Sequence, residues 1–178
     1  LSFSQISLNL KSFTGTKRRF NLIGQVEDIL IFDDYGHHPT EIAATLEAAR
    51  ASWENRRLIC IFQPHRYTRT MFLAHEFAQC FKDADEVILT DIYAAYEDPI
   101  PGVSTEIIVK LMHDKTPVYI PKKEEISNYI SEQARQGDLI ITMGAGDIHI
   151  VAKEIFSRLK QKAQKGWIEH ANAETRVA

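Results

Sequence analysis

The sequence predicts an α/β fold: a Rossmann-like, doubly wound and mostly parallel sheet with helices on both faces. The first observation behind this prediction is a set of short apolar runs, rich in Ile, Val and Leu and with little polar alternation, which is typical of strands covered on both faces. The second is that helical spacing of apolar residues separates these runs at intervals of about 22 to 30 residues, the length of a βαβ unit. Right-handed crossovers then distribute the helices over both faces of the sheet.

Predicted strands and predicted helices alternate along the chain. The strands span Ile29–Asp33, Leu58–Phe62, Val87–Thr90, Val118–Ile120 and Leu139–Thr142. The apolar stripes at helical spacing run from Ile42 to Trp53, Leu73 to Ala84, Ile107 to Met112, Ile126 to Ile130 and Ile148 to Leu159. The last stripe is the clearest of the five.

The bulk composition is that of a globular domain. A length of 178 residues suits one domain with a substantial core. The net charge of −3 gives no electrostatic reason to expect nucleic acid or an anionic membrane as a partner, and no apolar run approaches the roughly 18 residues that span a bilayer. Cys60 and Cys80 lie inside apolar segments, so we expect buried free thiols in a reducing compartment, the cytoplasm.

The two ends of the chain differ from the α/β body. Residues 1–20 match the alternation poorly, and we expect them to be the tail of a preceding domain with a linker. Residues 21–160 form the predicted α/β domain, and residues 161–178 are expected to be a charged, mobile extension of the last helix. Because the chain opens with Leu1 and not with Met, we expect a fragment of a longer protein.

Polar side chains follow most of the predicted strands, where open α/β sheets bind their ligands. The segments concerned are Asp33–Glu41, Gln63–Thr70, Asp91–Ala95 and Met143–Asp147. Acidic, imidazole, phenol and guanidinium groups are therefore expected to gather on one edge of the sheet.

The segment after the first strand allows three interpretations. Pro39 and Glu41 suit the first turn of a helix, so the segment is in part a polar loop with a helix cap. Asp and His side chains are also good metal ligands, although the adjacent His37 and His38 would point apart. The third interpretation is a polar substrate pocket that needs a carboxylate, a phenol and an imidazole.

The other segments indicate anion binding without a complete nucleotide site. His65, Arg66 and Arg69 place donor groups within one turn, and Arg binds a carboxylate or phosphate through a bidentate fork, although each Arg alone also suits surface charge. The small residues from Gly144 to Asp147 let a backbone approach a ligand, but a tight strand-to-helix turn needs the same residues. Neither of the glycine-rich phosphate-binding patterns occurs, so a complete ATP site within this chain is not expected.

Together these segments resemble the C-terminal domain of the Mur ligases, and within that family the ligases that join L-alanine to UDP-N-acetylmuramate. The matching segments are Gly15–Phe20, Asp33–Ile42, Phe62–Thr70, Thr90–Ala95, Pro101–Ser104 and Thr142–Ile148. Their order and spacing make the resemblance specific. Gly36 stands where many members have Ala, and Tyr96 where many have Gly.

The resemblance implies a three-domain, ATP-dependent amide-forming ligase of peptidoglycan biosynthesis. In such an enzyme ATP converts the lactyl carboxylate of the sugar to an acyl phosphate, which the amine of L-alanine attacks. The first domain holds UDP-N-acetylmuramate, the central domain carries the phosphate loop and the Mg²⁺ ligands, and the third binds L-alanine and closes over ATP. This chain would then hold the third domain and the tail of the central one, bind neither ATP nor Mg²⁺ stably, and be inactive alone.

The resemblance also implies roles for single residues. Arg19 and Asp34 match positions that approach the nucleotide phosphates, and with His37 they form the expected catalytic set. The positions around L-alanine are Tyr35, His37, His65 and Arg69. Further loop contacts are expected from Asp33, His38, Arg66, Gly144, Gly146 and Asp147, and no metal ligands are expected. A neutral His37 or His65 could orient the ammonium group or accept a proton from it, and the sequence does not decide between them.

Three alternatives stay open at this point. The recycling ligase that attaches an intact tripeptide to the same sugar has a similar segment after its first strand, whereas the loop at Gln63–Thr70 favours the alanine-adding enzyme. A non-catalytic binding module could use the same pocket. A metal-dependent hydrolase could be built on the Asp and His cluster.

Overall fold

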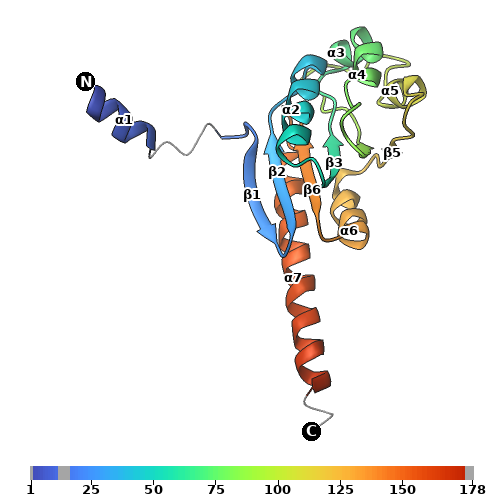
Figure 1. Cartoon of the computed structure of the whole chain (residues 1–178). Helices are drawn as coiled ribbons and strands as arrows, with labels where there is room; N and C mark the ends of the chain where they lie inside the picture. Colours follow the sequence, from blue (N-terminus) through green and yellow to red (C-terminus); the bar gives the residue numbers. More distant parts are fainter. Residues whose placement is uncertain (1, 12–16, 175–178) are drawn as a thin grey trace.

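The computed structural model describes residues 2–11 and 17–174, and its centre is a six-stranded sheet with the order β1-β2-β6-β3-β4-β5 (Figure 1). The strands are β1 (Asn21–Val26), β2 (Ile29–Asp34), β3 (Arg57–Phe62), β4 (Glu86–Leu89), β5 (Val118–Tyr119) and β6 (Asp138–Met143). Strand β1 pairs with β2 in antiparallel fashion, and the other neighbouring pairs are parallel. The sheet is therefore mostly parallel, as predicted.

Helices cover both faces of the sheet (Figure 1). They are α2 (Pro39–Ser52), α3 (Tyr67–Phe72), α4 (Ala74–Gln79), α5 (Glu106–Leu111), α6 (Lys123–Gln133) and α7 (His149–Glu174). A further helix, α1 (Phe3–Lys11), precedes the sheet in the chain. Buried residues of α2, α4 and α5 pack in one core cluster, and those of α6 and α7 pack in a second cluster on the opposite face. This arrangement confirms the doubly wound α/β fold.

Strand β3 shows why the predicted strands lack polar alternation. Leu58, Cys60 and Phe62 contribute to the cluster beneath α2 and α4, and Ile59 and Ile61 contribute to the cluster beneath α6 and α7. All five side chains are buried, because the strand is covered on both faces. Cys60 and Cys80 are buried free thiols, as expected, and burial raises the pKa of the Cys60 thiol.

The antiparallel strand β1 was not predicted. Its residues are mostly half-buried or exposed, and Gly24 interrupts the apolar pattern, so the segment lacks the signal of a buried strand. The stripe from Leu73 to Ala84 also differs from the prediction, because the chain forms two short helices that meet at Leu73, and the second ends at Gln79.

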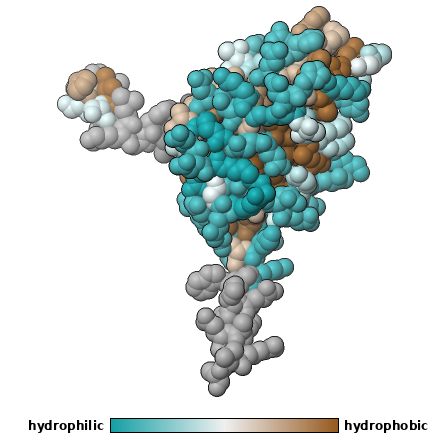
Figure 2. Space-filling model, turned by 45° about the vertical axis from the view of Figure 1, so that its right-hand side comes forward, coloured by the Kyte–Doolittle hydropathy of each residue, from teal (hydrophilic) through white to brown (hydrophobic). Residues whose placement is uncertain are grey.

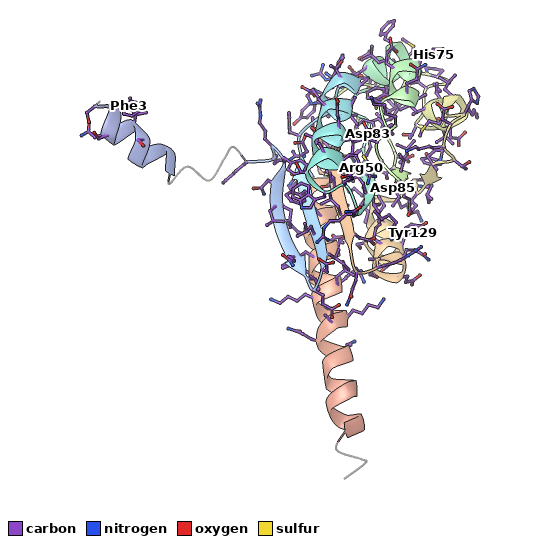
Figure 3. The ribbon with its side chains drawn as sticks, viewed as in Figure 1. Phe3, Arg50, His75, Asp83, Asp85 and Tyr129 are labelled. Carbon is purple, nitrogen blue, oxygen red and sulfur yellow. The ribbon has the colours of Figure 1, made fainter. Side chains whose placement is uncertain are left out.

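Polar side chains tie the helices to the sheet and cover much of the surface. Arg50 of α2 donates to Oδ2 of Asp85 at 2.6 Å and to the carbonyl of Asp83, and the three residues lie together in Figure 3. Hydrophilic residues cover much of the face shown in Figure 2. Within the described residues, none of the helices is long and apolar enough to cross a membrane.

The division into tail, domain and extension stays a prediction. Residues 3–11 form α1, and residues 161–174 continue α7, so the charged extension is helical over that range. The mobility that we expected for residues 161–178 also stays a prediction, and residues 175–178 lie outside the described residues.

Candidate functional site

The polar segments meet at the carboxyl edge of the sheet, as predicted. Asp34 at the end of β2 and Phe62 at the end of β3 both pair with Met143 at the end of β6. Beyond the strand ends, His65 and Tyr93 form a further parallel bridge that holds the loops after β3 and β4 together. The chain thus brings four loops to one edge.

Four aromatic rings form a row along this edge. The centroids of Tyr35 and His37 are 5.3 Å apart, and those of His37 and His65 are 5.8 Å apart. The rings of His65 and Tyr93 are stacked, with centroids 5.6 Å apart and an angle of 11° between the planes. The predicted alanine-contacting residues Tyr35, His37 and His65 therefore do lie together, and Tyr93 extends the row.

Arg69 lies beside this row of rings. Its Nη1 is 3.4 Å from Nδ1 of His65, which lies four residues before it. Burial of the imidazole and the charge of Arg69 lower the pKa of His65 from 6.5 to about 4. Because a guanidinium can only donate, Nδ1 of His65 is the acceptor, and Nε2 of the neutral ring carries the proton. The site therefore offers a fixed cation next to a neutral N–H donor, which suits an anionic group that accepts from both.

His37 has a defined tautomer in this arrangement. Its Nδ1 lies 3.0 Å from the carbonyl oxygen of Tyr35, and a carbonyl can only accept. Nδ1 therefore carries the proton in the neutral ring and Nε2 is left as an acceptor. The carboxylate of Glu41 lies 3.7 Å from the same Nδ1, where it would stabilise a protonated imidazole.

The two carboxylates that end β2 are both engaged. Asp33 is buried, accepts from Nε of Arg18 at 3.0 Å and accepts from the hydroxyl of Thr142 at 2.8 Å. Asp34 accepts from the backbone N–H groups of Phe20 and Gly36, each at 2.7 Å. In this conformation both side chains hold the edge together.

Three residues predicted from the sequence lie at the margin of the site. Arg19 is exposed and makes no hydrogen bond or ion pair with any residue that the structure describes. Arg66 is exposed, and its guanidinium is 3.9 Å from the carboxylate of Glu97. His38 is the N-cap of α2, and its ring accepts from the N–H of Thr40 at 3.3 Å.

The turn between β6 and α7 requires its small residues. Gly144 has φ of +145°, a backbone conformation that residues other than glycine rarely adopt. A Cβ on Gly146 would lie 2.5 Å from Oε1 of Gln63 and 2.6 Å from the ring of Tyr93. Asp147 at the end of the turn accepts from Nε2 of Gln63 at 3.1 Å and pairs with Lys123 of α6.

The edge offers no metal site of the predicted alternative kind. Among the residues that the structure describes, no group of three or more His, Cys, Asp or Glu side chains could hold a metal ion. Asp33 and Asp34 are occupied by donors, and His38 caps a helix. The metal-dependent hydrolase therefore finds no ligand set in the described part of the chain.

Sequence reasoning missed Arg18, Tyr93, Gln63 and Lys123. Arg18 stands next to Arg19 in the segment Gly15–Phe20, and nothing in that segment distinguishes the two side chains. Tyr93 and Gln63 follow predicted strands, so their place after a strand end was the available signal. Lys123 begins a helix far along the chain, and its contact with Asp147 has no sequence signature.

Comparisons with known proteins agree with this fold and edge. Residues 18–146 match the family model described as "Mur ligase, glutamate ligase domain". A protein named UDP-N-acetylmuramate–L-alanine ligase, from Desulforamulus reducens, is 47% identical over 165 residues, which are 91% of this chain and 36% of that protein.

Solved structures support the same assignment. The structure of UDP-N-acetylmuramate-alanine ligase from Thermotoga maritima has a TM-score of 0.75 at 26% identity, covering 91% of this chain and 34% of that one. A murein peptide ligase from Psychrobacter arcticus has a TM-score of 0.69 at 29% identity, covering 86% and 32%.

The fold defines a Rossmann-like α/β domain, a class whose members bind ligands at the carboxyl ends of their strands. The chain belongs to the Mur ligase family, of which it contains the C-terminal domain. It spans about a third of the length of the curated relatives that it matches.

Proposed function

We propose that this chain is the amino-acid-binding domain of an ATP-dependent ligase that joins L-alanine to UDP-N-acetylmuramate in peptidoglycan biosynthesis. The observation that carries the proposal is the pair of Arg69 and a neutral His65 beside His37 in the row of rings. An amino acid presents a carboxylate and an ammonium group on one carbon. Arg69 and Nε2 of His65 can donate to the carboxylate, and Nε2 of His37 can accept from the ammonium group. The cytoplasm is the proposed compartment, because ATP is supplied there.

Arg69 is the proposed anchor of the alanine carboxylate. A guanidinium binds a carboxylate through two parallel hydrogen bonds and keeps its charge at any physiological pH. Nδ1 of the neutral His65 accepts from Arg69, so Nε2 carries the proton and can donate to the same carboxylate. His65 adds no second positive charge and therefore does not repel the ammonium group of the amino acid. Tyr35 lies at the other end of the same row and bounds the space for the side chain.

His37 is the proposed acceptor of the proton that alanine must lose. An ammonium group is not nucleophilic, so a base has to take its proton before the amine can attack the acyl phosphate. Nδ1 of His37 is turned to the carbonyl of Tyr35, and Nε2 is therefore the free acceptor. Glu41 would stabilise the imidazolium that forms, since its carboxylate lies 3.7 Å from Nδ1.

ATP and Mg²⁺ are proposed to be bound mainly by the parts of the ligase outside this chain. The sequence holds no glycine-rich phosphate loop. The carboxylates at the edge are already used, because Asp33 holds Arg18, Asp34 holds two backbone N–H groups and Asp147 holds Lys123. We therefore propose that this chain supplies no metal ligand. From the resemblance to the L-alanine ligases, we also propose that Arg19 and the Asp34 segment approach the nucleotide phosphates when the domains close, with Arg19 as the donor and Asp34 holding the backbone of Phe20 and Gly36.

Phosphate release in a complete protein tests the proposal. The longer protein that carries this domain should release phosphate from ATP in the presence of Mg²⁺, UDP-N-acetylmuramate and L-alanine, whereas the 178-residue chain alone should not. Sustained ligation by the chain alone would contradict the proposal that ATP and Mg²⁺ are bound mainly outside this chain. A longer protein that needs no alanine for phosphate release would contradict the substrate.

The second candidate is the ligase that attaches a tripeptide to the same sugar. The similarity to the murein peptide ligase of Psychrobacter arcticus favours it, and the higher identity to the L-alanine ligases favours the first candidate. The same assay with L-alanyl-γ-D-glutamyl-diaminopimelate in place of L-alanine separates the two. A non-catalytic binding module would bind L-alanine but would not release phosphate from ATP, whether as the longer protein or as the 178-residue chain.

A further inference from the structure

Arg18 precedes the sheet, and yet its guanidinium reaches both sides of the candidate site. Nε donates to Oδ2 of Asp33 at 3.0 Å, Nη1 donates to the carbonyl of Gly146 at 3.1 Å, and Nη2 donates to the carbonyl of Gly144 at 2.6 Å. Cζ also lies 4.9 Å from the centroid of the Tyr35 ring, over its face. One side chain therefore connects the end of β2 with the turn between β6 and α7.

The backbone around Arg18 is held to the same edge. The carbonyl of Arg18 accepts from the N–H of Tyr35 at 2.6 Å, and the N–H of Phe20 donates to the Asp34 carboxylate. Arg18 and Phe20 have φ of +60° and +44°, which residues other than glycine adopt mainly where their surroundings hold them. Hydrogen bonds of the main chain and of the side chain of Arg18 therefore both fix the position of its guanidinium.

The contacts of Arg18 complete a closed circuit around the carboxyl edge. The circuit runs from Arg18 through Tyr35, His37, His65, Tyr93 and Gly146, and back to Arg18. The first contact is between the guanidinium of Arg18 and the Tyr35 ring, and the next three are between neighbouring aromatic rings. The Tyr93 ring then lies against Gly146, and the Gly146 carbonyl accepts from Arg18. Removal of Arg18 would open the circuit at one place.

The same contacts set the direction of the turn. The C=O and N–H groups of a trans peptide point in opposite directions. Because Arg18 draws the carbonyls of Gly144 and Gly146 to itself, the N–H groups of Ala145 and Asp147 are turned away from it. Without the guanidinium, nothing among these contacts would hold both peptide groups in this orientation.

We infer that Arg18 is a positioning residue that fixes the Gly144–Asp147 turn and the Tyr35 ring relative to each other and so keeps the rim of the amino-acid site in one arrangement. The inference deepens the proposed function, on which it rests for the identity of the ligand. Its structural part, the coupling of turn and ring, is independent of that function.

Amide hydrogen exchange of the 178-residue chain tests the coupling. The readouts are the amides of Gly144, which donates to the carbonyl of Asp34, and of Tyr35, which donates to the carbonyl of Arg18. In Arg18→Ala both should exchange faster by about tenfold or more, because a charge-assisted network is lost at the turn. Arg18→Lys, which keeps the charge without the fork, should give an intermediate effect, and it remains informative if Arg18→Ala does not fold.

Arg56 provides a matched control. Its side chain is 21% exposed, close to the 23% of Arg18, and it pairs with the carboxylate of Asp28 before the start of β2. Arg56→Ala should leave the exchange of Gly144 and Tyr35 unchanged. Protection of both amides in Arg18→Ala or Arg18→Lys at the wild-type level would overturn the inference, and so would a uniform increase across the sheet, because that is a loss of global stability.

Kinetics of the longer protein test the connection to the ligand. Arg18→Ala should raise the KM for L-alanine on the order of tenfold and change kcat less, with partial rescue by Arg18→Lys. An active protein whose alanine KM is unchanged would overturn the role at the rim. A longer protein that shows no alanine-dependent activity at all would refute the proposed function, while the exchange experiment would still decide whether Arg18 couples turn and ring.

Discussion

Arg69 in α3 holds its guanidinium 3.4 Å from Nδ1 of His65, which lies just before the helix. Burial of the imidazole and the adjacent positive charge both disfavour the imidazolium, so the pKa of His65 falls to about 4. Under the proposed function, this pairing separates two tasks. Arg69 supplies the charge for a carboxylate, and His65 supplies a donor at Nε2 that stays neutral at physiological pH, because its Nδ1 accepts from the guanidinium.

The neutral state of His65 leads to a prediction on pH. We expect NMR titration of the 178-residue chain to give a His65 pKa of about 4, and Arg69→Ala to raise it towards 6.5. Because the folded pKa lies below that of the unfolded chain, the unfolded chain binds the extra proton between about pH 6.5 and pH 4, and His65 makes the fold less stable as the pH falls through that window. Urea unfolding of wild type and His65→Gln over this range measures the contribution, and a His65 pKa at or above 6.5 would contradict the prediction.

Loss of the Arg69 guanidinium should weaken alanine binding. In the longer protein we expect Arg69→Ala to raise the KM for L-alanine roughly ten- to a hundred-fold, because a lost charge-assisted hydrogen bond costs about 1.5–3 kcal/mol. Arg56→Ala is the matched control, since Arg56 pairs with Asp28 before the start of β2, away from the candidate site. An alanine KM that changes equally in both variants would show that Arg69 is not the anchor.

The sequence predicted the body of the fold because its strands are buried on both faces. The run at Leu58–Phe62 needs no partner information to be identified, since every side chain in it is apolar. Strand β1 has no such signal: Leu22 is 52% exposed, and the strand is stabilised by its pairing with β2. An edge strand of this kind depends on its neighbour, which single-sequence patterns do not contain.

The candidate site, too, was predicted only in part from the sequence. Tyr35, His37, His65 and Arg69 follow strand ends, so the topology alone brings them together. The choice between Arg18 and Arg19 is different, because it depends on the positive φ of Arg18 and on two carbonyls more than 120 residues away in the chain. Local sequence does not contain that information.

The ion pair at the opposite end of the sheet should be important for stability. Nε and Nη2 of Arg57 donate to the two carboxylate oxygens of Asp138 at 2.9 and 2.7 Å, and the Asp138 side chain is 2% exposed. We expect Asp138→Ala to lower the free energy of unfolding by about 3 kcal/mol, because a partly buried guanidinium loses both hydrogen bonds to its buried partner and keeps, among the described residues, only the Glu86 carboxylate at 3.6 Å and the Gln133 carbonyl. Urea denaturation of the 178-residue chain measures the change.

Asp28 is the control for that measurement. It pairs with Arg56 at 2.5 Å, but its side chain is 56% exposed. Asp28→Ala should therefore change the free energy of unfolding by less than about 1 kcal/mol. Equal losses in the two variants would show that burial does not set the difference between these pairs.

Close packing of Tyr93 on the turn should make Gly146 sensitive to substitution. A Cβ at this position would lie 2.6 Å from the Tyr93 ring, so we expect Gly146→Ala to cost about 1–3 kcal/mol of stability. The cost should be smaller in a Tyr93→Ala background, although contact with Gln63 remains. A double-mutant cycle by urea denaturation measures the coupling, and additive losses would show that the ring is not the obstacle.

Domain closure gives the last prediction, which concerns Arg19 and Asp34. Arg19 is exposed and makes no polar contact with the described residues, as a group reserved for a ligand in another domain would. We expect Arg19→Ala to lower kcat of the longer protein by about 10²–10³ with little change in the alanine KM, since loss of one donor to developing phosphate charge has effects of this size. The melting temperature of the 178-residue chain should not change.

Asp34 should differ from Arg19 in one respect. Its carboxylate accepts the N–H groups of Phe20 and Gly36 at 2.7 Å each, so Asp34→Ala leaves two donors without an acceptor and should lower the free energy of unfolding by about 1–3 kcal/mol in addition to lowering kcat. The alternative is that Asp34 only caps its loop and that Arg19 is only solvated. In that case Asp34→Ala would lose stability alone and Arg19→Ala would lose nothing. Steady-state kinetics of the longer protein, together with melting curves of the 178-residue chain, separate these cases, because a normal kcat in both variants excludes a role at the phosphates.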